Sequence, residues 1–339
     1  MSRRKTAVPP PATLPERLKP WLDTQAGYSW LDEAGQPDAR PMALQALARL
    51  GADDRRLQAF AQQAERRLRP APAAQAWPLG DPWYERLGQH GAWAGYRDLF
   101  TQWLEHEGAG DALQQLLPRL LQGLAGGAFH GLVRTAHAVA AAHRGELADA
   151  LATWAACWAP LGRPAPDSAP TLDDPEAVLR RLGVVRRGHG LEERQRAAAE
   201  APGFDALAAS LRLQAGSVPR LAGLAAKAYA ASGDAGMARL VTSALALEGL
   251  LPFVDPDDHE TLAAARAAWW RAFMATVSAA GLRVRPALAA QPWPALVAAA
   301  QACDDAERIQ LVDACVQWQA RDPAAGPWAE AATRALTPA

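Results

Sequence analysis

The sequence predicts an all-α protein, a single large multi-helix domain of packed helical hairpins. Ala, Leu, Arg, Gln and Glu, which favour helices, dominate nearly every segment, and short alternating runs of β-branched residues are almost absent. No repeat of about 30 to 50 residues can be aligned along the chain, which argues against a regular repeat solenoid. We therefore expect helices of unequal length separated by irregular loops.

Clusters of proline and glycine divide the chain into its expected helices. Asp53-Asp54 and Asp257-Asp258 are typical helix starts, because a short acidic side chain can cap exposed backbone amides. We expect residues 1–18 to form a flexible Pro-rich tail and residues 19–335 to form the helical domain. The expected helices are 41–50, 53–68, 96–108, 109–124, 129–142, 145–157, 174–181, 191–200, 204–213, 218–231, 235–250, 258–280, 293–302 and 305–320.

The composition is that of a globular protein with a sizeable core, since 50% of the 339 residues are hydrophobic and 21% are charged. A net charge of −1 gives no reason to expect nucleic acid or an anionic membrane as a partner. No apolar run reaches the roughly 18 residues of a membrane span. The three cysteines, Cys157, Cys303 and Cys315, show no paired spacing, so we expect a reducing, cytoplasmic location.

Thirteen tryptophans are the compositional oddity of the chain. Most of them lie in helical segments among Ala and Leu, where their large surfaces can fill the gaps that alanine leaves. The alternative is an aromatic pocket for a flat small molecule, since ligand sites are usually apolar.

The segment 126–156 carries three histidines on an otherwise apolar helix. His130 and His137 are seven residues apart, which places both on one helix face with Arg134 between them. They could converge on a metal, on an anionic substrate or on each other, or each could be a core histidine bonded to a carbonyl. Nearby glycines indicate either close backbone packing or room for a ligand. These glycines are Gly126, Gly127 and Gly131.

Five stretches of the chain resemble the questin oxidase-like family, helical proteins that include fungal enzymes oxidising aromatic polyketide rings. The more specific stretch is 126–154, which contains Phe129-His-Gly-Leu-Val-Arg134 and then Glu146-Leu-Ala-x-Ala-Leu-Ala-x-Trp154. The others lie in the family's order at 41–60, 229–242, 269–274 and 304–315. The resemblance covers nearly the whole chain and implies a helical fold and oxidation by molecular oxygen.

The resemblance also implies an iron held by several histidines and, in some members, by a carboxylated lysine. Neutral imidazoles and a carboxylate suit non-haem iron. This sequence keeps His130, so the resemblance leaves one metal ligand at most and no iron cofactor is expected here. At the family's other ligand positions stand Ala39, Arg239, Leu245, Glu307 and Gln310, of which Gln310 replaces the lysine.

Two hypotheses follow for function. In the first, the chain is an oxidoreductase-like enzyme with an altered site around an aromatic substrate. Its acid, base and anion clamp would be His130, Arg134, His137 and Glu307. In the second, the chain is a non-catalytic remnant that binds a ligand or a protein partner, and Arg239 and Glu307 fill the former metal space as an ion pair. Convergence of Arg239, Glu307 and His130 in one cavity favours the second hypothesis.

Overall fold

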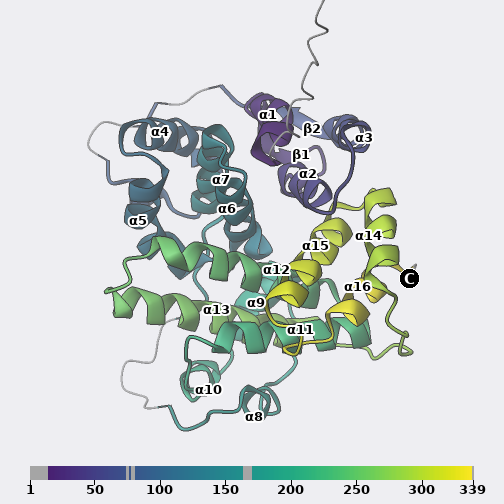
Figure 1. The fold of residues 1–339 in the computed structure, drawn as a ribbon. Helices are drawn as coiled ribbons and strands as arrows, with labels where there is room; N and C mark the ends of the chain where they lie inside the picture. The colour runs from purple at the N-terminus through teal and green to yellow at the C-terminus, as the bar shows by residue number, and fades with distance from the viewer. Residues whose placement is uncertain (1–13, 74–75, 78–80, 163–169, 338–339) are drawn as a thin grey trace, which may run out of the picture.

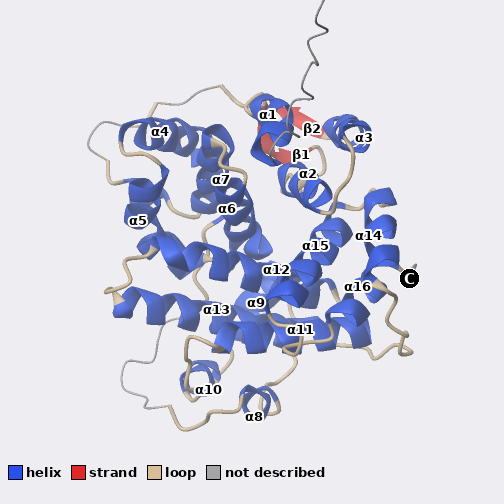
Figure 2. Ribbon diagram, viewed as in Figure 1, coloured by secondary structure: helices blue, strands red, loops and turns tan. Residues whose placement is uncertain are grey.

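The computed structural model confirms the all-α class. It describes residues 14–73, 76–77, 81–162 and 170–337. Within these residues the chain forms sixteen α-helices and one two-stranded antiparallel sheet (Figure 1; Figure 2). The first eight α-helices are α1 (Leu14–Gln25), α2 (Arg40–Arg49), α3 (Asp54–Glu65), α4 (Trp93–His106), α5 (Ala109–Leu120), α6 (His130–Ala140), α7 (Arg144–Cys157) and α8 (Pro175–Leu179).

The second half of the chain is helical in the same way. Its α-helices are α9 (Gly190–Ala199), α10 (Phe204–Ala209), α11 (Ser217–Ser232), α12 (Ala235–Leu250), α13 (His259–Ala280), α14 (Trp293–Ala302), α15 (Ala306–Arg321) and α16 (Trp328–Leu336). Short 3₁₀ turns connect several of them, and η4 (Gly126–Phe129), directly before α6, is the one that matters for the site. The strands are β1 (Tyr28–Asp32) and β2 (Leu68–Pro70), in which Tyr28 lies opposite Pro70 and Asp32 opposite Leu68.

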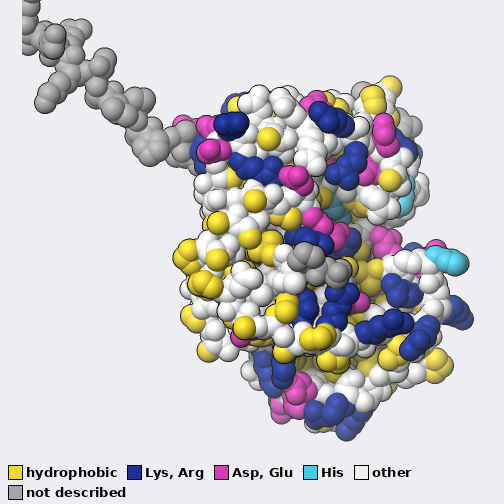
Figure 3. All heavy atoms as spheres, turned by 90° about the vertical axis from the view of Figure 1, so that its right-hand side faces the viewer, with side chains coloured by type: hydrophobic (Ala, Val, Ile, Leu, Met, Phe, Trp, Pro, Cys, Tyr) yellow, Lys and Arg dark blue, Asp and Glu magenta, His cyan; other side chains and the backbone are white. Residues whose placement is uncertain are grey.

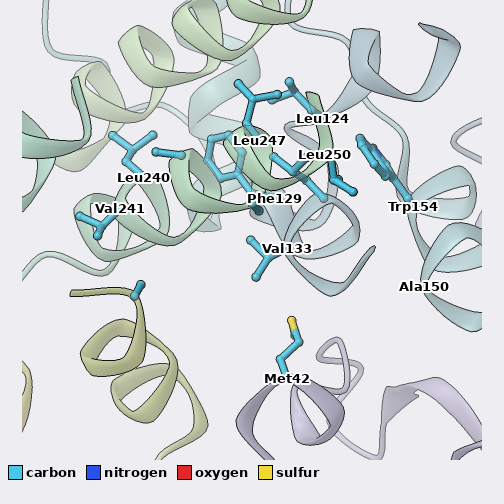
Figure 4. Packing of buried hydrophobic residues seen from close by; sticks show 14 of the residues in the cluster. Met42, Leu124, Phe129, Val133, Ala150, Trp154, Leu240, Val241, Leu247 and Leu250 are labelled. Carbon is cyan, nitrogen blue, oxygen red and sulfur yellow. The ribbon is translucent and has the colours of Figure 1, made fainter. Parts of the chain in front are cut away.

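Four helices from distant parts of the sequence pack together in the middle of the molecule (Figure 1). Helix α6 contacts α2 and α12, and α15 contacts the same two helices. We call α2, α6, α12 and α15 the four-helix cluster. Figure 4 shows part of its interior, where Met42 of α2 points toward Val133 of α6 and Phe129 lies near Leu247 and Leu250 of α12.

The expected helix starts are present as side-chain caps. The carboxylate of Asp53 accepts a hydrogen bond from the backbone N–H of Arg56 at 2.8 Å. Asp258 does the same for the N–H of Thr261 at 2.9 Å. Each cap satisfies one of the amides that the first turn of a helix leaves free, so these two helices begin where the acidic pairs indicate.

The structure differs from the sequence-based expectation at both ends and near residue 68. Helix α1 begins at Leu14 and buries Leu18, so the last residues of the expected tail 1–18 are helical, while residues 1–13 lie outside the described part of the chain. The expected helix 53–68 ends at Glu65, because the chain continues into β2. Helix α16 and the sheet were not expected.

The tryptophans mainly fill the core. Five of them are among the largest fully buried side chains: Trp154, Trp269, Trp270, Trp318 and Trp328. Four of these five donate an indole N–H to an oxygen of another residue, whereas the buried Nε1 of Trp154 has no partner among the described residues. The gap-filling interpretation therefore describes these residues.

Figure 3 shows the face that includes α3 and α14, on which charged side chains of both signs are mixed with hydrophobic ones. None of the described helices combines the length and the hydropathy that a bilayer crossing requires. Cys157, Cys303 and Cys315 are all free thiols, as their spacing predicts.

Candidate functional site

A cavity of about 200 Å³ lies within the four-helix cluster, and we call it the His130 cavity. All four helices contribute to its wall, each with residues from its N-terminal half. Its polar lining is Gln36, His130, Arg239, Thr242, Glu307 and Gln310, and its apolar lining includes Ala39, Met42, Phe129 and Val133. No tryptophan is among the described residues that line it, so the alternative of a Trp-lined pocket does not apply here.

An unusual backbone turn brings His130 to the cavity wall. Gly127, Ala128 and Phe129 have φ angles of 60°, 50° and 71°, so three successive residues adopt the left-handed conformation. Residues with a side chain rarely adopt it, and each instance costs on the order of 1–3 kcal/mol. The strained turn ends at His130, where α6 begins, and strain of this kind is common at binding sites.

The glycines of this segment serve close packing against α7. An ideal Cβ on Gly126 would lie 1.7 Å from the carbonyl oxygen of Cys157. One on Gly131 would lie 2.5 Å from the Cα of Trp154. Only a hydrogen fits at either position, so close backbone packing is the correct alternative for these two glycines.

His130 presents a neutral imidazole with one unused nitrogen. Its Nε2 atom is buried and has no hydrogen-bond partner among the described residues. Burial lowers the pKa of His130 well below its usual 6.5, and the positive charges of Arg134 and Arg239 lower it further. A hydrogen bond with the Asp38 backbone acts in the opposite direction and is outweighed. His130 is therefore uncharged at neutral pH, and an unpaired buried nitrogen of this kind is costly unless a ligand satisfies it.

Arg239 and Glu307 form the expected ion pair in the same cavity. Arg239 comes from α12 and Glu307 from the first turn of α15, and the guanidinium Nη2 lies 2.5 Å from Oε1 of the carboxylate. The side chains remain 34% and 56% exposed, which places the pair at the mouth of the cavity. The structure thus brings together Arg239, Glu307 and His130, as the ion-pair hypothesis requires.

Arg134 does not reach this cavity. Its side chain is buried on the side of α7, where Nε and Nη2 donate to the two carboxylate oxygens of Glu146 at 2.7 and 3.0 Å. A bidentate, fully buried pair is a strong link between α6 and α7. The expected role of Arg134 as an anion clamp beside His130 therefore has to be corrected, because the neighbouring helix supplies a carboxylate that holds it elsewhere.

His137 lines a second, smaller cavity of about 90 Å³, which we call the His137 cavity. The two histidines do lie on the same side of α6, since Thr242 and Gln310 line both cavities. Seven residues of helix separate them by about 10.5 Å along the axis, so they do not converge on one ligand atom. Leu245 lines this second cavity, so the positions assigned to the family's metal site are divided between two cavities.

Two residues that the sequence analysis missed hold His137 in place. The guanidinium of Arg49 lies 3.3 Å from Nδ1 of His137 and forms a bidentate ion pair with Asp313, whose shortest contact is 2.5 Å. Burial and the charge of Arg49 lower the pKa of His137 well below 6.5. Burial raises the pKa of Asp313 above its usual value, and Arg49 opposes this. An aspartate inside the apolar run 309–315 was the one sequence signal for this pair.

The side chains of the His130 cavity do not fit an iron ion. They offer one imidazole and one carboxylate, and that carboxylate is bonded to a guanidinium. Non-haem iron normally takes three or more nitrogen or oxygen ligands from the protein. Across the described ranges, no three His, Cys, Asp or Glu side chains come together as a ligand group. No step of a mechanism is therefore assigned to a metal here.

The fold and the site together define an all-α protein in which an ion pair and a neutral histidine line the His130 cavity. Residues 40–203 match the family described as questin oxidase-like, and this match supports membership of the chain in that family. The matched segment contains α2 and α6, whereas α12 and α15 lie beyond it. A comparison with curated proteins found no match.

Proposed function

We propose that this protein binds a small hydroxylated aromatic molecule in the His130 cavity, with the Arg239–Glu307 ion pair in the space that relatives fill with iron. The observation that carries the proposal is the buried Nε2 of His130, which has no partner among the described residues, in a side chain that lines a cavity. A ligand hydroxyl that donates to this nitrogen would satisfy it.

The shape and lining of the cavity favour a single aromatic ring. Met42, Phe129 and Val133 supply apolar walls, and His130 supplies one acceptor. About 200 Å³ is below the roughly 300–1,000 Å³ of pockets for drug-sized ligands, so a one-ring phenol fits better than a polycyclic polyketide. Neutral His130 can accept a hydrogen bond from a phenol hydroxyl, and the nearby positive charge of Arg239 favours negative charge on the phenol oxygen.

The ion pair gives a physical reason for the absence of a metal in this proposal. Glu307 is 56% exposed and keeps much of its solvation, and Arg239 pairs with it at the cavity mouth. A metal ion at the same place would have to displace the guanidinium or lie beside it, which like-charge repulsion opposes. In this proposal, Arg239, at the position of a family histidine, takes the place of the metal as the positive charge beside Glu307.

A second candidate function is the family's own activity, oxidation of an aromatic polyketide-like substrate by molecular oxygen. The family match supports it. It would require a metal or another oxidant bound by residues outside the described lining of the His130 cavity.

Metal analysis and calorimetric titration with 4-methylphenol test the proposal. We expect no stoichiometric iron in the purified protein and saturable one-site binding of the phenol. Replacing His130 by Leu should weaken phenol binding by about 3- to 10-fold, because it removes one hydrogen bond between neutral groups. Binding should be constant between pH 8 and pH 6.5, because the pKa of His130 lies well below 6.5.

The matched control is His189→Leu, which removes an imidazole from an exposed position and should leave phenol binding unchanged. Stoichiometric iron, together with oxygen consumption on hydroxylated anthraquinones or simple phenols, would establish the second candidate instead.

A further inference from the structure

We propose that the ligand extends from the His130 cavity into the His137 cavity and carries a carboxylate at that end, so that the ligand class is a hydroxylated aromatic carboxylic acid. This inference rests on the proposed function and adds a second binding site to it. Its basis is the two lining residues that the cavities share and the different hydrogen-bonding character of their walls.

The two cavities adjoin across Gln310 and Thr242. Both residues belong to both linings. The hydroxyl of Thr242 is already bonded to carbonyl groups of its own helix, whereas the side-chain amide of Gln310 makes no hydrogen bond with any described residue. The Gln310 side chain, which lines both cavities, can therefore shift without breaking a hydrogen bond to a described residue.

The His137 cavity offers donors and has little accepting capacity left. Asp313 already accepts hydrogen bonds from Nε and Nη2 of Arg49 and from Nε2 of Gln317. His137 accepts a hydrogen bond at Nδ1 from the guanidinium of Arg49. The proton of the neutral imidazole therefore lies on Nε2, which makes Nε2 a donor. A ligand group that only accepts hydrogen bonds suits this wall, and a carboxylate is such a group.

Arg321 supplies a positive charge at the rim of the same cavity. It lies in the last turn of α15, is exposed, and forms no ion pair with any described residue. Its guanidinium carbon lies 5.7 Å from the ring centroid of Trp318, and its charge also acts on Glu248, so a ligand carboxylate would share this charge with Glu248. The charged side chains of this lining are two arginines and one aspartate, so the wall carries a net positive charge.

Away from the His137 cavity, the His130 cavity adjoins a groove whose wall holds more acidic than basic side chains. This groove of about 480 Å³ shares Pro37, Ala39 and Glu307 with the His130 cavity. Its wall also contains Asp32, Asp304 and Asp305 against Arg40 and Arg67. Like charges repel, so a ligand with one anionic end is oriented with the carboxylate toward Arg321 and the hydroxyl toward His130.

The spacing of the histidines sets the length of the ligand. About 10.5 Å of helix rise separates them, and a hydrogen bond of about 2.8 Å at each end of the ligand covers about half of this distance. A carboxylate bonded to the ring directly or through a short spacer can therefore reach from one cavity into the other. The probes are 4-hydroxybenzoate, 4-hydroxyphenylacetate and 3-(4-hydroxyphenyl)propionate, each titrated beside the neutral 4-alkylphenol of equal length.

In the full-length wild-type protein, the acid of optimal length should bind about tenfold or more tightly than its neutral analogue, as expected for charge-assisted hydrogen bonds. Arg321→Gln should lower the ratio of acid affinity to alkylphenol affinity by at least about threefold and leave alkylphenol binding unchanged. The matched control is Arg187→Gln, which removes the same charge from an exposed loop position. It should change neither the affinity for the acids nor the affinity for the alkylphenols. Circular dichroism verifies that each variant is folded.

The results separate this inference from the proposed function. If alkylphenols bind and the acids bind no better, or if Arg321→Gln has no effect on acid binding, the carboxylate site is wrong and the phenol site stands. If neither series binds, the proposed function itself fails.

Discussion

At the scale of single residues, the two histidines of α6 differ through partners that come from elsewhere in the chain. The sequence predicts correctly that His130 and His137 share a helix face. It could not show that Arg49, 88 residues before His137, would occupy one imidazole and leave the other free. Helical periodicity fixes the direction of a side chain, whereas tertiary packing fixes its partner.

The meeting of Arg239 and Glu307 could be predicted because the family resemblance assigned both to one former site. The position of Arg134 could not be predicted in the same way. Glu146, only 12 residues away on α7, directs the Arg134 side chain toward α7 and away from the cavity. Helical spacing places Arg134 near the histidines, and a local ion pair decides where its guanidinium lies.

The buried pair gives a prediction that separates a structural role from a catalytic one. Arg134→Leu leaves Glu146 buried without its partner, so we expect the free energy of unfolding to fall by about 3–5 kcal/mol in urea titrations. The double variant Arg134→Leu/Glu146→Leu should recover much of this loss, because both charges are removed. Phenol affinity of the folded protein should stay unchanged. A specific loss of binding in a stable variant would return Arg134 to the site.

At the scale of elements, the sequence predicts most helices because proline, glycine and acidic caps mark their ends. It misses α1, which contains Pro20 and follows a Pro-rich segment, so local signals oppose a helix there. Burial of Leu18 and Leu22 and the packing of α1 on α2 and α7 overcome this preference. Strands β1 and β2 have five and three residues, which is too short for a clear alternating pattern.

Packing of the strained turn before α6 against α7 gives a second stability prediction. Gly126→Ala places a methyl group 1.7 Å from the Cys157 carbonyl, so the backbone of η4 or α7 has to move. We expect a loss of more than about 3 kcal/mol in the free energy of unfolding, together with weaker phenol binding, since the turn positions His130.

The matched control for this variant is Gly110→Ala in the first turn of α5, where a Cβ would meet nothing within 4 Å. There, alanine should be neutral or stabilising by up to about 1 kcal/mol, because it reduces the conformational entropy of the unfolded chain. Equal effects of the two substitutions would contradict the packing argument.

At the scale of the whole molecule, the site depends on helices from both ends of the chain. The matched segment 40–203 provides His130, Met42 and Phe129, whereas Arg239 and Glu307 come from α12 and α15 beyond it. The cavity therefore exists only when the two parts are packed together. The expected domain covers residues 19–335, and the contacts of α2 with α15 join the two parts of that range.

Charged links between the two parts lead to a prediction about cooperativity. Arg49 is bonded to Asp313, and Arg56 reaches Asp304 and the backbone carbonyls of Gln301 and Cys303. The buried hydrophobic residues form a continuous core through both parts, so opening one part would expose apolar surface of the other. We expect one unfolding transition in urea, with far-UV circular dichroism and tryptophan fluorescence coinciding. Tryptophans lie in both parts, so fluorescence would detect a separately unfolding unit, and two separated transitions would show that the expected domain 19–335 is divided.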